Sequence, residues 1–164
     1  MPALVCLMIV LCFSLPGALV MGCDSSTSDS TGSAGSSAST ADARVIFHAA
    51  DGREAELMVE VARSRPERAQ GLMQRQQLDA ESGMIFIWDY PVHGGFWMKD
   101  TYIPLSIAFI SEDGDIVDIQ DMQPLGLANH KPSAKYIYAV EANQGWFAEH
   151  GISIGDRAEF LESQ

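Results

Sequence analysis

Three cationic residues and a tryptophan could together form a ligand pocket in this chain of 164 residues. Trp97 and Lys99 are two residues apart, so they would share one face of an extended strand. Arg68 and Arg75 are seven residues apart, so they would share one face of a helix. Cations beside an aromatic ring suit a carboxylate, phosphate or sugar ligand, and these four residues form our candidate ligand-binding site. The alternative is that Trp97 covers the core while the cations pair with nearby acidic residues.

The other residue types that carry chemistry form no recognisable cluster. The histidines, His93, His130 and His150, show no metal-binding spacing, and most methionines lie in apolar runs that are typical of core. Ser106 lacks the Gly-x-Ser-x-Gly turn of a hydrolase. Four aspartates lack the order of a calcium loop and indicate a solvated edge: Asp113, Asp115, Asp118 and Asp121. We therefore expect no metal, no cofactor and no catalytic residue, with an envelope enzyme or ligand carrier as the alternative hypothesis.

The elements that would position these residues are short. Ser64 and Glu67 have the spacing of a capping box, which predicts a helix from there to about Gln74. A second short helix is predicted after Asn143 and ends at Gly151. Apolar runs and alternation predict about eight strands: Val45–Phe47, Glu54–Val61, Gly83–Trp88, Gly95–Thr101, Pro104–Ile110, Ile116–Met122, Tyr136–Glu141 and Arg157–Leu161. The predicted fold is a small α+β domain, a mostly antiparallel sheet or half-closed barrel with two short helices.

The N-terminal part predicts export and lipid attachment. Residues 1–22 contain no charged residue or histidine, and their apolar stretch suits an export signal rather than a bilayer span. Gly22-Cys23 resembles the junction at which bacterial lipoproteins receive diacylglycerol, so Cys23 is the expected attachment site. Residues 24–43 hold eight Ser, three Thr and two Gly and predict a flexible tether, followed by a globular domain over residues 44–164. A plain cleaved signal peptide and an uncleaved apolar anchor are the alternatives.

The overall charge of the chain disfavours some classes of binding partner. The chain has 10 Lys and Arg against 22 Asp and Glu, a net charge of -12. This surplus disfavours nucleic acid and anionic headgroups as partners, so we expect membrane attachment only through the N-terminal lipid. The expected location is the cell envelope, with the domain outside the cytoplasm and its ligand or protein partner unknown. A salt-adapted host would produce the same acidity without any functional meaning.

Two segments carry a family resemblance. Gly71-Leu72-Met73-Gln74-Arg75 and Phe96-Trp97-Met98-Lys99-Asp100-Thr101, with Gly145-Trp146 and Gly155-Asp156 after them, resemble domain of unknown function 192 (DUF192, also called UPF 0127) over nearly all of residues 45–160. The resemblance implies one compact domain, often with a signal or lipid anchor, and no established activity. Asp100 stands where Asn is commoner in the family, and Leu125–Ser133 lacks the cysteines of some members.

Overall fold

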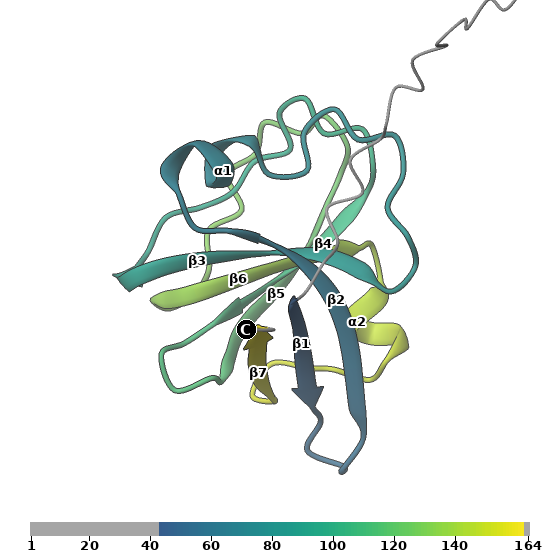
Figure 1. Cartoon of the computed structure of the whole chain (residues 1–164), viewed down its shortest axis with the longest axis vertical. Coiled ribbons are helices and arrows are strands. Elements are labelled where there is room, and N and C mark those ends of the chain that lie inside the picture. Colours follow the sequence, from purple (N-terminus) through teal and green to yellow (C-terminus); the bar gives the residue numbers. More distant parts are fainter. Residues whose placement is uncertain (1–42, 163–164) are drawn as a thin grey trace, which may run out of the picture. The chain divides into compact units, whose positions relative to one another are not determined.

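Seven strands form one mixed sheet in the computed structural model, which describes residues 43–162 (Figure 1). Their order across the sheet is β5-β4-β6-β3-β2-β1-β7. The two helices, α1 and α2, are Arg65–Gln70 and Trp146–Glu149. The strands are β1 Ala43–His48, β2 Glu54–Ala62, β3 Ser82–Val92, β4 Leu105–Ile110, β5 Ile116–Met122, β6 Tyr136–Asn143 and β7 Arg157–Glu162.

The pairing confirms a mostly antiparallel sheet. Only β2 and β3 run parallel among the described strands, and the connection between them contains α1, because parallel neighbours need a crossover. The expectation of about eight strands was wrong by one. Gly95–Thr101 is a loop in which Phe96 makes a single bridge to His130, because the chain turns at Asp100 with a positive φ of 55°.

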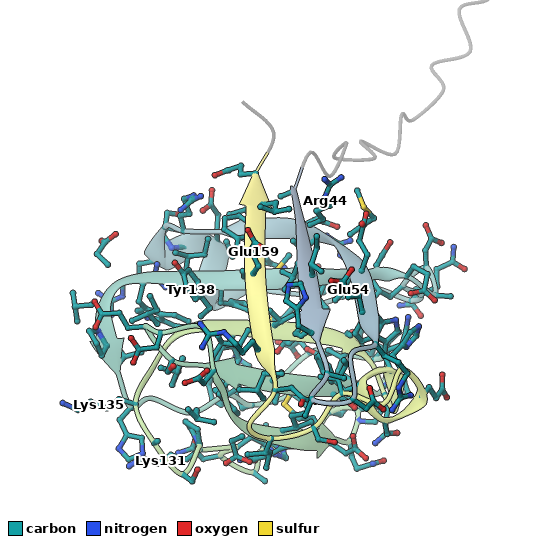
Figure 2. All side chains as sticks on the ribbon, turned by 90° about the horizontal axis from the view of Figure 1, so that it is seen from below. Arg44, Glu54, Lys131, Lys135, Tyr138 and Glu159 are labelled. Carbon is teal, nitrogen blue, oxygen red and sulfur yellow. The ribbon has the colours of Figure 1, made fainter. Side chains whose placement is uncertain are left out.

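The sheet curls into a half-barrel that closes at one corner. β5 and β7 are the outer strands, and an isolated bridge joins Asp115, just before β5, to Arg157, the first residue of β7. The Ile116 amide donates to the Asp156 carbonyl at 2.8 Å, which fixes this closure. Figure 2 shows Arg44, Glu54 and Glu159 on the outer face of β1, β2 and β7, where charged side chains meet water.

Two apolar clusters cover the two faces of the central strands. Inside the half-barrel, Phe47 packs against Trp146 and Phe147, which α2 supplies. On the outer face, α1 and the loops after it lie over β3, β4 and β6 (Figure 1). Every residue of β4 is buried, which explains why Leu105–Ile110 is an apolar run without alternation.

The helices differ in detail from expectation. The capping box is confirmed: Glu67 donates its amide to Ser64 Oγ, and its carboxylate accepts from the Ser64 amide at 2.8 Å. However, α1 ends at Gln70 rather than near Gln74, because Gly71 turns the chain with φ 49°. The second helix begins after Gly145, whereas Asn143 ends β6 and donates to the Asp79 carbonyl.

The predicted export signal and lipid-attachment site lie outside the described residues, as does the tether except for Ala43, the first residue of β1. Between residues 43 and 162, no helix has the length and apolar character that crossing a bilayer requires.

Candidate functional site

Two hollows adjoin each other beside the end of α1, and Gln70 and Gly71 line both of them. The small hollow has a volume of about 40 Å³, enough for a water or one functional group. The wide hollow is open and has a volume of about 470 Å³. The small hollow is lined by residues 68–73 with Phe86, Phe96, Trp97, Thr101 and Glu141. The wide hollow is lined by Glu60, Val61, Ala62, Pro66, Glu67, Gln70, Gly71, Arg75 and Met84.

Backbone hydrogen bonds hold the loop that carries Trp97. The Met98 amide donates to the Gly126 carbonyl at 2.9 Å, and the Asp100 carbonyl accepts from the Gln74 amide at 2.7 Å. Met98 is fully buried beneath the loop, whereas the Trp97 side chain is 54% exposed. The tryptophan is therefore an exposed aromatic ring on a fixed rim. Because the loop is already ordered, it would lose little conformational entropy when a ligand stacks on the ring.

The segments that form this rim contain backbone conformations that are unusual for residues other than glycine. Gln74, Asp100 and Leu125 are the residues other than glycine with positive φ in the described chain, at 64°, 55° and 60°. All three lie in segments that hydrogen-bond to each other around the loop 96–101. Left-handed conformations are costly for L-residues and cluster at ligand sites. The resemblance to a family with Asn at position 100 is consistent with this geometry, because Asn and Asp tolerate it best.

Arg68 and Trp97 line the same small hollow, so the structure brings two of the four candidate residues together. The guanidinium of Arg68 lies 5.0 Å from the Trp88 ring, and its Nη1 donates to the backbone carbonyls of Arg63 and Ile87. Part of its hydrogen-bonding capacity is thus used by the protein itself.

Arg75 and Lys99 lie nearby but outside the small hollow. Arg75 follows the end of α1, so it does not share a helix face with Arg68, and it lines the wide hollow while bound to Glu60. Lys99 is not among the residues that line either hollow. Its Nζ lies 5.7 Å from the Trp97 ring and 3.9 Å from a carboxylate oxygen of Asp100.

Glu141 is the site residue that sequence reasoning missed. It lies on β6 opposite Met84 of β3 and Ile107 of β4, on the sheet face that the outer apolar cluster covers. Its side chain is 5% exposed, and burial raises the pKa of its carboxyl to about 8. One signal could have found it: Glu141 is the single charged residue in a strand that is otherwise apolar from Tyr136 to Ala142.

Ser106 is buried but serves the fold. Its hydroxyl donates to the Asp121 carboxylate at 2.5 Å and accepts from the Gly145 amide at 2.9 Å, so it joins β4 to β5 and to the start of α2. Asp118 accepts from the Ser133 amide, and Asp115 pairs with Arg157. No three or more His, Cys, Asp or Glu side chains between residues 43 and 162 gather closely enough to hold a metal ion.

The profile of DUF192, described as an uncharacterized ACR, matches residues 46–160. The chain belongs to the DUF192 family. Among curated proteins none matches the chain significantly.

Two solved structures share the DUF192 fold of this chain. One, from Sinorhizobium meliloti, is 37% identical, covers 72% of this chain and 92% of its own, and has a TM-score of 0.70; its description proposes a transcription regulator. The other, from Novosphingobium aromaticivorans, is 33% identical, covers 71% of this chain and 83% of its own, has a TM-score of 0.68 and is of unknown function. Both likenesses extend over most of the DUF192 domain.

Proposed function

We propose that this DUF192 protein is a lipid-anchored, extracytoplasmic binding domain that takes a small polar ligand at the small hollow. The observation that carries the binding role is the exposed ring of Trp97 on a rim fixed by backbone hydrogen bonds, directly beside a buried wall. Exposing the apolar ring of a tryptophan to water is unfavourable unless a partner covers it. Flat polar ligands such as sugars stack on such a ring.

The size of the two hollows supports a ligand that is held at one end. The small hollow admits one functional group, while the adjoining wide hollow offers open space for the remainder. Gly71 separates them, and a Cβ there would lie 3.3 Å from Cζ of Phe86, so the absence of a side chain keeps both open.

A mass measurement tests the binding role. We expect native mass spectrometry of gently purified protein to detect a bound small molecule, and Trp97→Ala to reduce its occupancy at least tenfold. Tyr102→Ala is the matched control, since Tyr102 is a 45% exposed aromatic residue that does not line either hollow. An adduct unaffected by Trp97→Ala would place the ligand elsewhere and contradict the proposal.

The proposed anchor rests on residues 1–43. An uncharged apolar leader, the Gly22-Cys23 junction and a Ser-rich tract together favour export and acylation of Cys23. We expect Cys23→Ala to move the protein from the membrane fraction to the soluble fraction. Cys12→Ala is the control, because Cys12 lies within the leader and should leave the distribution unchanged. An unchanged membrane fraction in Cys23→Ala would contradict lipid attachment at that site.

DNA binding, which the description of the Sinorhizobium meliloti protein raises, is not part of this proposal. A net charge of -12 would repel a phosphate backbone, and counter-ion release, the usual source of affinity for DNA, requires clustered cations. The three lysines of the chain, Lys99, Lys131 and Lys135, are exposed in loops, and Figure 2 shows Lys131 and Lys135 near one edge of the molecule.

A further inference from the structure

The carboxyl group of Glu141 is buried without a protein partner. No residue between 43 and 162 donates a hydrogen bond to it, although the side chain is only 5% exposed. Every fully buried side-chain oxygen in that part of the chain has a partner. The carboxyl oxygens must therefore retain some contact with open space, and Glu141 lines the small hollow. When it is ionised, a carboxyl at this depth is a strong hydrogen-bond acceptor for whatever occupies the hollow.

No cation between residues 43 and 162 forms an ion pair with this carboxyl. Arg68 is the only other charged residue that lines the small hollow, and its guanidinium is directed to Trp88 and to backbone carbonyls. Across the wide hollow, Arg75 is already paired with Glu60. When Glu141 is ionised, its compensating charge must therefore come from outside residues 43–162.

The remaining groups in the small hollow also favour a ligand group that donates hydrogen bonds. The Thr101 hydroxyl donates to the Lys99 carbonyl at 3.3 Å, so it offers only lone pairs to a ligand. The rings of Phe86, Phe96 and Trp97 line the walls, and the electron-rich faces of aromatic rings attract cations. An incoming group with several N–H donors and a positive charge would satisfy these neighbours together.

We propose that the small hollow binds the protonated amino group of a ligand, with Glu141 as its counter-ion. This inference rests on the proposed function, because it takes the small hollow as the ligand site. A volume of about 40 Å³ suits a primary ammonium group on a thin carbon chain. The rest of the ligand then passes the rim at Trp97.

Binding of an amine here displaces a proton. At neutral pH the carboxyl of free Glu141 holds its proton, because burial raises its pKa to about 8. When the ammonium enters, the carboxyl O–H bond releases its proton to solvent and the ammonium keeps its own three protons. Affinity should consequently rise about tenfold per pH unit up to about pH 8 and then level off.

The test uses three probes of equal length that differ in charge. The full chain is titrated at pH 6, 7, 8 and 9 and at constant ionic strength with propylammonium chloride, propan-1-ol and sodium propionate, following amide NMR shifts of residues 68–73 and 96–101. We expect propylammonium alone to saturate, at millimolar concentration, with about tenfold tighter binding at pH 7 than at pH 6.

Variants identify the residue responsible. Glu141→Gln keeps the shape of the side chain but carries no charge, so it should abolish propylammonium binding at every pH. Glu112→Gln, at an exposed turn between β4 and β5, is the matched control and should bind as the native protein does. Because the pH dependence is measured on the native chain, the test does not depend on the folding of a variant.

Three results would overturn the inference: no saturable propylammonium binding, equal binding of propan-1-ol or propionate, or an affinity independent of pH. Equal binding of the neutral or anionic probe would leave the proposed function standing, since a ligand would still enter the small hollow. An adduct in native mass spectrometry that Trp97→Ala leaves unaffected would instead reject the proposed function itself.

Discussion

Arg75 donates two hydrogen bonds to the carboxylate of Glu60, at 2.5 Å and 2.6 Å. The pair joins the turn after α1 to strand β2 across one wall of the wide hollow. The hydrogen bonds to Glu60 raise the pKa of Arg75 further above its ordinary value. An anion entering the wide hollow would have to compete with Glu60, so Arg75 contributes to the shape of this wall more than to anion affinity.

A double-mutant cycle should detect this pair as a modest stabilising contact. We expect Arg75→Met and Glu60→Gln to show a coupling of about 1 kcal/mol in urea denaturation, because the side chains are still 36% and 25% exposed. Arg75→Lys should lose most of this coupling, since lysine does not bond both oxygens in a fixed plane. The control pair Arg53 and Asp51 is 57% and 55% exposed and should couple by no more than a few tenths of that value. Additive effects at Arg75 and Glu60 would contradict the prediction.

Stability should fall with rising pH because of Glu141. Its pKa is 4.5 in an unperturbed chain and about 8 in the folded protein, so between these values the folded state binds the extra proton. The free energy of unfolding therefore decreases across that window by about 1.4 kcal/mol per pH unit. The measurement is urea denaturation from pH 5 to pH 8 on the native chain and on Glu141→Gln. The native protein should lose several kcal/mol relative to the variant, whereas parallel curves would count against burial of an ionisable carboxyl.

Removing the Ser106 hydroxyl should destabilise the domain by about 2 kcal/mol. The Gly145 amide would lose its acceptor and the Asp121 carboxylate would lose a donor. Ser111→Ala is the control, because the Ser111 hydroxyl makes only a 3.2 Å contact with the Asp115 amide in a turn. Chemical denaturation of Ser106→Ala and Ser111→Ala distinguishes them, and equal stabilities would show that the Ser106 network is dispensable.

A methyl group at Gly83 should destabilise by about 3 kcal/mol. Its Cβ would lie 2.4 Å from the Glu141 carbonyl oxygen and 2.8 Å from Leu57 Cδ2, in the buried centre of the sheet. Gly52→Ala, at φ 87° in open space, has only backbone strain to overcome and should cost about 1 kcal/mol. Thermal unfolding of both variants provides the comparison, and a Gly83→Ala protein as stable as Gly52→Ala would contradict this packing.

Local patterns in the sequence predict most of the fold. The continuous apolar run at Leu105–Ile110 corresponds to a strand that is buried on both faces. The alternation at Glu54–Ala62 corresponds to a strand that is buried on one face. The loop 96–101 is the exception. Phe96 and Met98 point inward and Trp97 outward, so the predicted alternation of burial is confirmed, but hydrogen bonds to distant segments replace those of a strand.

The candidate site was less predictable than the fold because it depends on long-range neighbours. Residue type grouped Arg68 with Trp97, but the long-range hydrogen bond between Gln74, after α1, and the loop 96–101 is what brings both to the small hollow. Glu141 matters because the outer apolar cluster and α1 cover the sheet face on which it lies. The sequence of β6 alone does not show which segments cover that face. The predicted helix length misled the grouping of Arg75, since α1 ends at Gln70 and Arg75 lies in the turn that follows it.

Outer strands of a sheet usually offer unpaired backbone groups to a second molecule, which promotes fibre formation. Here β5 and β7 meet at Asp115 and Arg157, so each satisfies the other at that corner. Aspartates along β5 and glutamates along β7 place like charge on both borders. Two copies of this domain would therefore repel each other where strand-by-strand aggregation would have to begin, which favours solubility at high protein concentration.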